Sequence, residues 1–174
     1  MQHLVDSVRK DLQNENWYAA LFMALTLPDI CGKIQYPKEI SEARYVKWFN
    51  KYLSHKYTSE VGPSRERNVF LSGEDCYALR CSLLHEGKDI ISGQRCRHAL
   101  DSFLFVAKVG AHCNYFEVNG HKFLQLSVSR FCEDVCSSIE TWLTDVGSDS
   151  IVQNRLAETV KIEAPASRFG VRFA

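Results

Sequence analysis

Apolar positions recur with a helical period through the first half of the chain. Apolar residues spaced four apart predict an amphipathic helix over residues 2–15. Residues 17–27 are apolar on nearly every face, which indicates a second helix that is buried. Pro28 disfavours an unbroken continuation of this helix, and Gly32 is a candidate to end any further turn. We therefore expect two consecutive helices followed by a break.

Two more helices are expected before residue 90. One begins at Ser41 and carries a wide stripe of aromatic and aliphatic residues. Residues 54–71 are polar and read as a connection between helices. Ser72 then has the character of a helix N-cap and precedes acidic residues that suit the positive end of a helix dipole. The helix that follows is expected to run to about Glu86 and to stop at Gly87.

The hydrophobic period changes after residue 100. Residues 102–107 suit a buried strand. Residues 112–118 and 121–128 flank an Asn-Gly dipeptide at 119–120, which is a strong signal for a two-residue hairpin turn. An amphipathic pattern over residues 129–146 predicts a final long helix.

These elements predict a mainly α fold. We expect a bundle of about five helices, with a small antiparallel β-sheet or hairpin inserted before the last long helix. Residues 1–174 are interpreted as one domain. Its parts are a helical region, a β insertion, a helix and a tail without a clear pattern, at about residues 1–90, 100–128, 129–146 and 147–174.

Composition gives no positive sign of several function classes at the level of the whole chain, although a neutral total leaves local basic patches possible. Twenty-one basic residues balance 21 acidic ones, so net charge does not indicate a nucleic-acid-binding or membrane-surface protein. The longest apolar run is about half of the roughly 20 residues that span a bilayer, so no membrane association is expected. The seven cysteines lack framework spacing, which favours reduced thiols and a cytoplasmic location.

The helix expected to end at Glu86 has two apolar faces, about 140° apart at 100° per residue. The natural core face carries Cys76, Leu79 and Leu83. The second face carries Tyr77, Cys81 and Leu84, with Arg80 and His85 on its two edges. A second apolar face on one helix indicates a partner surface, and we expect a twofold homodimer through it.

The segment Arg80-Cys81-Ser82-Leu83-Leu84-His85 resembles the Arg-x4–6-His signature of the HEPN superfamily. The surrounding residues 79–87, and their place on a late helix of a helical domain, strengthen the resemblance. It implies a small, often dimeric helical domain of a kind that includes many metal-independent endoribonucleases from toxin–antitoxin, abortive-infection and antiviral systems. The family commonly has a polar residue, often Asn, where this chain has Cys81, and the Asn-Gly hairpin goes beyond a minimal all-helical bundle.

The chemistry of the two polar residues agrees with that implication. Cleavage of RNA by its own 2′-hydroxyl needs a base, an acid and positive charge at the phosphate. The unperturbed pKa of histidine, about 6.5, suits His85 to proton transfer. The guanidinium of Arg80 offers a fork that matches phosphate oxygens. Two copies facing each other would supply two of each residue.

The first functional hypothesis is therefore a metal-independent, cofactor-free endoribonuclease with Arg80 and His85 as catalytic residues. Its expected partners are a second copy, RNA, and an antitoxin or a nucleotidyltransferase. The alternative is a non-catalytic HEPN-like binding module for RNA, a nucleotide or a protein. A purely structural interpretation also stays open, in which Arg80 forms an ion pair and His85 caps a helix end.

Further basic residues are candidates for RNA binding, provided that they converge in space. They are Arg65, Arg67, Arg95 and Arg97, with His98 beside the last. The alternative is ordinary solvated loop charge.

A zinc site near the hairpin is the last candidate. Its potential ligands are His112, Cys113, His121, Cys132 and Cys136. The two-residue turn puts His112 and His121 on one face but about 20 Å apart, and paired thiols on a helix are common in protein cores. No metal site is therefore expected.

Overall fold

The computed structural model describes residues 1–108 and 110–162, and within these residues the chain is mainly α-helical, as the sequence predicts. The helices are α1 (Gln2–Gln13), α2 (Trp17–Gln35), α3 (Ser41–Tyr52), α4 (Gly73–Glu86), α5 (Val128–Asp145) and α6 (Ser150–Ala157). The strands are β1 (Thr58–Val61), β2 (Glu66–Val69), β3 (Ser102–Val106), β4 (Asn114–Val118) and β5 (His121–Ser127).

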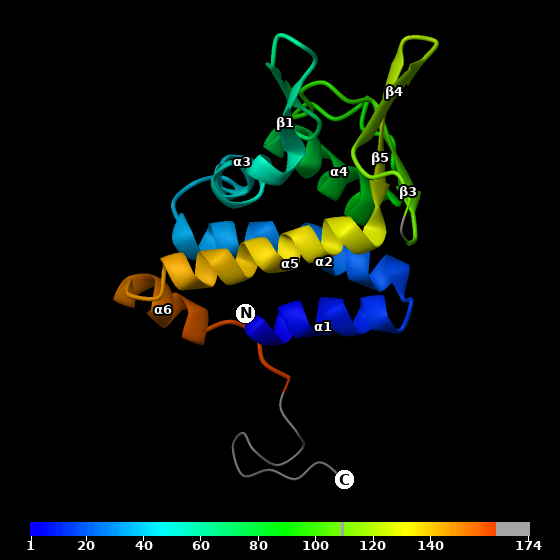
Figure 1. Ribbon diagram of the computed structural model, residues 1–174. Coiled ribbons are helices and arrows are strands. Elements are labelled where there is room, and N and C mark those ends of the chain that lie inside the picture. Colours follow the sequence, from blue (N-terminus) through cyan, green and yellow to red (C-terminus); the bar gives the residue numbers. More distant parts are fainter. Residues whose placement is uncertain (109, 163–174) are drawn as a thin grey trace.

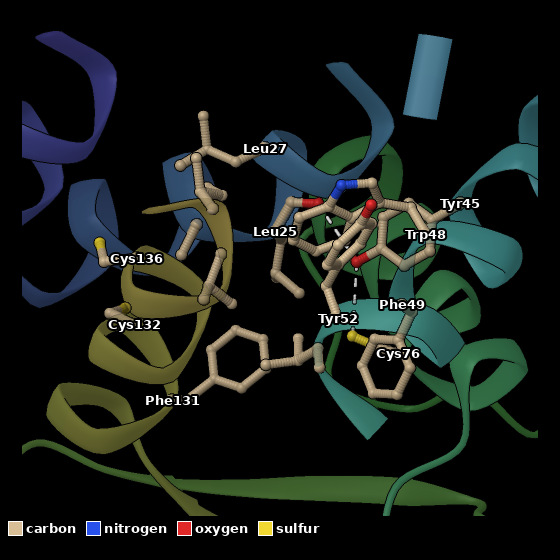
Figure 2. Packing of buried hydrophobic residues seen from close by; sticks show 14 of the residues in the cluster. Leu25, Leu27, Tyr45, Trp48, Phe49, Tyr52, Cys76, Phe131, Cys132 and Cys136 are labelled. Carbon is tan, nitrogen blue, oxygen red and sulfur yellow. Dashed lines mark hydrogen bonds between the residues drawn. The ribbon is translucent and has the colours of Figure 1, made fainter. Parts of the chain in front are cut away.

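Three helices form the base of the molecule. α1, α2 and α5 pack against one another, and α3 and α4 pack on α2 from the other side (Figure 1). The hairpins β1–β2 and β4–β5 both project on the side away from α1. The buried side chains between α2, α3 and α5 form one continuous apolar cluster that includes Trp48, Phe49 and Phe131 (Figure 2).

α2 continues past the break that the sequence predicts. Both Pro28 and Gly32 lie inside the helix, which ends at Gln35. Pro28 removes one backbone donor, but it is fully packed in the core, and there packing outweighs local preference. At Gly32 an added Cβ would lie 2.8 Å from the backbone oxygen of Arg44. This glycine therefore allows α3 to approach α2 closely, and it does not end the helix.

The polar connection expected over residues 54–71 contains a short 3-10 turn (Ser54–Tyr57) and the antiparallel hairpin β1–β2. Its turn uses positive φ angles at Gly62 and Arg65. Because nearly every residue of β1 and β2 is exposed, these strands lack the alternation of apolar and polar residues that marks a half-buried strand.

The second sheet has the strand order β3-β5-β4. β4 and β5 form the expected hairpin, with Phe116 opposite Phe123 and positive φ angles at Asn119 and Gly120. β3, however, pairs with β5 in parallel, so the expected antiparallel sheet is wrong for this strand. β4 lies between β3 and β5 in sequence but at the opposite edge in space, and so provides the crossover that parallel pairing needs.

The end of the described chain adds one helix that the sequence pattern did not predict. α6 begins after Asp149, whose carboxylate accepts hydrogen bonds from the backbone N–H groups of Ile151 and Val152 at 3.0 and 3.1 Å. The rest of the expected tail, residues 163–174, lies outside the described residues. No helix in the described part of the chain has the length and apolar character needed to cross a bilayer.

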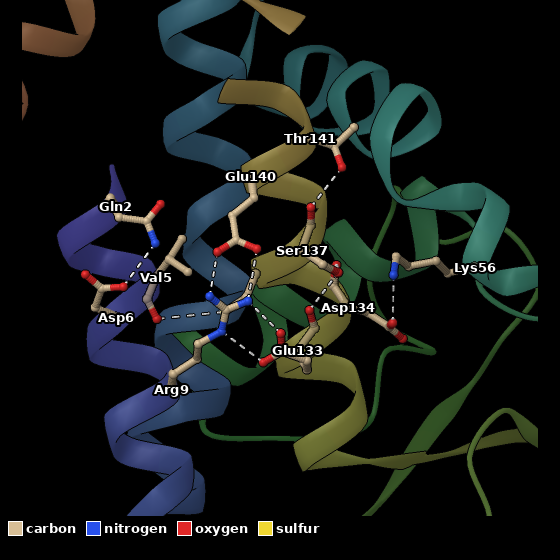
Figure 3. A network of polar contacts seen from close by, with 11 residues as sticks. Gln2, Val5, Asp6, Arg9, Lys56, Glu133, Asp134, Ser137, Glu140 and Thr141 are labelled. Atoms are coloured by element: carbon tan, nitrogen blue, oxygen red, sulfur yellow. Dashed lines mark hydrogen bonds and ion pairs between the residues drawn. The ribbon is translucent and has the colours of Figure 1, made fainter. Parts of the chain in front are cut away.

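A polar network ties α1 to α5. The guanidinium of Arg9 donates hydrogen bonds to Glu133 at 2.6 Å and to Glu140 at 2.5 Å (Figure 3). These contacts raise the pKa of Arg9 and lower that of Glu140. The network lies on the α1–α5 side of the base, and because one guanidinium meets two carboxylates it carries one net negative charge.

Candidate functional site

The ends of α4 lie where the sequence predicts them. The Ser72 hydroxyl accepts a hydrogen bond from the Asp75 backbone N–H at 3.0 Å, as an N-cap does. Gly87 adopts the left-handed conformation, with a φ of 67°, and its N–H bonds to the Leu83 carbonyl. The helix between these caps carries both Arg80 and His85.

Arg80 and His85 are in direct contact. Nη1 of Arg80 lies 3.2 Å from Nε2 of His85. A guanidinium only donates hydrogen bonds, so this contact requires Nε2 to be the unprotonated nitrogen of a neutral imidazole. The described structure therefore brings together the two residues that the motif places five positions apart.

Arg80 is also anchored by α2. Its Nη2 donates to Oδ2 of Asp29 at 3.1 Å, while the other oxygen of Asp29 accepts from Arg44 of α3, with Nη2 at 2.9 Å. These side chains are mostly buried, with exposed fractions of 15% for Asp29, 15% for Arg44 and 20% for Arg80. We call Asp29, Arg44, Arg80 and His85 the Arg80 cluster. Two guanidinium groups against one carboxylate leave it one net positive charge, with His85 neutral.

Sequence reasoning missed Asp29 and Arg44. One signal was present, because Asp29 is the single charged residue in residues 17–32 of an otherwise apolar segment. A charge in such a segment requires a buried partner. The identity of the partner depends on Gly32, which lets the backbone of Arg44 pass close to α2, and this approach is not visible in the sequence.

No protein-family model, curated protein or solved structure matches this chain. The observations that bear on function are therefore the geometry of the Arg80 cluster and the sequence motif that supplies Arg80 and His85.

The second apolar face of α4 is more covered than expected. Tyr77 does not lie away from the core, because its ring packs against Tyr45 of α3 with centroids 5.3 Å apart. Burial raises the pKa of Tyr77 to about 12, and the nearby Cys81 contributes to the shift. Cys81 and Leu84 are half-buried as well. The exposed residues of α4 are His85 and Glu86, at its C-terminal end.

The four candidate RNA-binding arginines lie on the β1–β2 hairpin and in the loop after α4. Arg65 lies on the β1–β2 turn with Glu60 at 3.9 Å, and Arg97 pairs with Asp101 at 2.7 Å. Arg67 lines a surface cavity of about 340 Å³ together with His98. Arg95 is exposed in the loop after α4. Among the described residues, none of these four contacts Arg80 or His85 through a hydrogen bond or ion pair.

The candidate zinc ligands do not share one set of neighbours. Nδ1 of His112 accepts a hydrogen bond from the Ser127 backbone at 3.2 Å, and its Nε2 lies 3.6 Å from Asp134. Cys132 and Cys136 are buried in the core. In residues 1–108 and 110–162, no three His, Cys, Asp or Glu side chains converge as metal ligands would.

Proposed function

We propose that this chain is a HEPN-like endoribonuclease that cleaves RNA through the 2′-hydroxyl of the RNA itself, with Arg80 and His85 as its catalytic residues. The observation that carries the proposal is the 3.2 Å contact between Nη1 of Arg80 and Nε2 of His85, at the partly open end of α4. A permanently charged phosphate ligand beside a proton-accepting imidazole is the minimum set that this reaction needs.

The proposed reaction uses each group at a defined atom. A base removes the proton of the 2′-hydroxyl, the 2′-oxygen bonds to phosphorus, and the bond from phosphorus to the 5′-oxygen breaks as an acid protonates that oxygen. In this structure the Nε2 lone pair of His85 accepts a hydrogen bond from Arg80, and we assign His85 as the base that takes the 2′-hydroxyl proton once this nitrogen is released to the substrate. Arg80 stabilises the charge on the phosphate. The acid is the protonated imidazolium form of His85 of a second copy, released from its own Arg80, in a composite site formed by a twofold dimer.

A specific observation favours the alternative, a HEPN-like module that binds RNA, a nucleotide or a protein without cleaving it. Nη2 of Arg80 is engaged by Asp29 and Nη1 by His85, so a phosphate has to share the guanidinium with both. Cys81 also replaces the polar residue that is common in the HEPN family. The resemblance further suggests a bacterial toxin–antitoxin or phage-defence setting, with an antitoxin or nucleotidyltransferase as partner and a cytoplasmic location.

The test is cleavage of a panel of RNAs in the presence of EDTA. Wild type is expected to cut and to leave a cyclic phosphate on one product and a 5′-hydroxyl on the other. Loss of a positioned proton-transfer group lowers rates by about 100-fold to 10,000-fold, so His85→Ala should be nearly inactive. Arg80→Lys should fail because an ammonium does not reproduce a two-pronged phosphate contact. Cys81→Asn should be at least as active as wild type.

The matched control is His121→Ala, which removes an exposed histidine from β5 and should leave cleavage unchanged. Equal cleavage by wild type, His85→Ala and Arg80→Ala would assign the activity to another site or to a contaminant. Binding without cleavage across the whole panel would favour the binding module.

The composite site also requires a dimer. Light scattering should give a mass near twice 19.9 kDa. A monomer at high micromolar concentration would contradict the shared site, whatever the protein does to RNA.

A further inference from the structure

The outward face of α2 presents two aromatic side chains to solvent. Within this helix of 19 residues, the exposed positions are Tyr18, Phe22 and Lys33. Tyr18 is 78% exposed and Phe22 is 36% exposed. The solvent-facing stripe of a helix is normally polar. An aromatic pair in that place, on a helix that is otherwise buried, indicates a binding surface.

This aromatic stripe, defined as Tyr18 and Phe22, leads directly to the Arg80 cluster. At 100° per residue, both side chains project within about 20° of the direction of Asp29, one on each side. At 1.5 Å per residue, Phe22 lies about 10 Å and Tyr18 about 16 Å along the axis from Asp29. Asp29 itself holds Arg80 at 3.1 Å. The stripe and the candidate catalytic residues therefore share one side of α2.

We propose that the aromatic stripe stacks the bases of a single-stranded RNA whose phosphate is bound by Arg80. The proposal rests on the function proposed above and names the form of RNA that the site takes. Surfaces that bind single strands combine a cationic track for the backbone with aromatic rings for the bases. Here the net positive charge of the Arg80 cluster lies at one end of the stripe, and the exposed Lys33 lies beyond it on the same face.

Two other ligands, duplex RNA and a second copy of the chain, fit the aromatic stripe less well. Duplex RNA keeps its bases stacked inside the helix, so exposed rings have no base faces to meet. A second copy of the chain would need about 800 Å² of buried surface on each partner, far more than two side chains supply. Stacking is tolerant of sequence because every base has a π face. We therefore expect a preference for single strands with little preference for base identity.

The experiment measures binding separately from cleavage. A short, fluorescently labelled, single-stranded RNA with 2′-O-methyl sugars has no free 2′-hydroxyl, so catalysis cannot affect the result. Tyr18→Ala and Phe22→Ala should each weaken its binding by about 10-fold, the loss typical of one stacked base. Tyr18→Phe should bind like wild type. An abasic oligonucleotide of the same length should bind wild type and both alanine variants alike.

The control is Tyr115→Ala, which removes a tyrosine of 43% exposure from β4, away from the stripe, and should leave binding unchanged. If both stripe variants bind like wild type while Arg80→Ala does not, the aromatic stripe does not bind bases, and the proposed function stands. If they lose affinity for the base-containing strand while wild type never cleaves ordinary RNA, the stripe stands and the nuclease is wrong. Equal affinity for duplex and single strand, or stripe variants that bind RNA normally but become monomeric, would overturn the stripe proposal.

Discussion

Replacement of Asp29 by alanine tests the central structural feature of the candidate site. In the native protein, the Asp29 carboxylate neutralises charge from two mostly buried guanidinium groups, those of Arg44 and Arg80. Its removal leaves both cations without their carboxylate partner, and Arg80 already has one buried donor, Nε, that has no hydrogen-bond partner among the described residues.

The size of the effect follows from the burial of the three side chains. Breaking a fully buried ion pair costs about 3–5 kcal/mol, whereas an exposed pair contributes about 0–1 kcal/mol. At exposed fractions of 15–20% these groups lie nearer the buried limit, so we expect Asp29→Ala to lower the free energy of unfolding by about 2–4 kcal/mol. For a chain of this length that corresponds to a fall in Tm of about 5–15 °C.

Thermal and urea unfolding of Asp29→Ala, Arg80→Ala and the double variant would measure both the effect and its origin. Residues in direct contact are expected to show a coupling energy of about 0.5–3 kcal/mol, so the double variant should lose less stability than the two single losses combined. Asp145→Ala is the control, because Asp145 also accepts two short hydrogen bonds but is far more exposed, and its Tm shift should be much smaller. Additive losses, or an Asp29→Ala shift no larger than the control, would refute the anchoring role.

Three other outcomes follow from the structure. Asp75 is buried and accepts hydrogen bonds from the backbone N–H of His98, at 2.7 Å, and from those of the next two residues. Asp75→Ala should therefore lower the free energy of unfolding by about 3–5 kcal/mol and speed hydrogen exchange at these three amides. Unchanged exchange at these amides would contradict the role of Asp75. Burial raises the pKa of Asp134, but the neighbouring His112, at 3.6 Å, and the hydrogen bond from Lys56 lower it by more, so its net pKa is below the usual value. The stability that Asp134 provides is thus full above about pH 4 and is lost as pH falls through the lowered pKa, and Asp134→Asn should flatten the acid side of a Tm–pH profile. Burial raises the pKa of four thiols, those of Cys31, Cys76, Cys132 and Cys136. These thiols should resist a disulfide reagent at neutral pH until the protein unfolds. Rapid labelling of all seven cysteines in the folded protein would contradict their burial.

Elements with local signals were predictable from the sequence. Ser72 and Gly87 set the ends of α4 through contacts within one turn, and the Asn-Gly pair set the register of β4 against β5. These features depend on side chains and backbone angles of neighbouring residues, which a sequence displays directly.

Elements that depend on contacts with distant parts of the chain could not be predicted from the local sequence. Pro28 and Gly32 suggest a helix end locally, but both are packed inside α2, where contacts with other helices decide the outcome. The hairpin β1–β2 carries almost no buried residue, so no hydrophobic alternation marks it. The parallel pairing of β3 with β5 is a property of topology and leaves no trace in the strand itself.

The candidate site also combines residues that the local sequence predicts with residues that only the packing of helices brings together. Arg80 and His85 were predictable because a single helix carries both, five positions apart. Asp29 and Arg44 reach the cluster from two other helices, and their meeting depends on the close approach at Gly32. The motif thus locates the site, while the packing of α2, α3 and α4 decides how Arg80 is held.

That packing also determines how a phosphate can bind. An arginine side chain has five N–H donors, one on Nε and two on each Nη. In this structure Nε is buried, Asp29 takes one hydrogen of Nη2, and His85 takes one of Nη1, so each Nη retains one hydrogen. On the proposed function, a phosphate would accept both remaining hydrogens while Asp29 keeps its contact, and the guanidinium would be oriented before RNA binds, which is the condition for electrostatic stabilisation without reorganisation. Lysine at this position has three donors on one nitrogen and no fixed fork. Arg80→Lys should accordingly keep much of the ion pair with Asp29, and hence most of the stability, while losing affinity for single-stranded RNA. An Arg80→Lys variant that loses stability to the same extent as Arg80→Ala, yet binds RNA normally, would show that the guanidinium of Arg80 serves the fold alone.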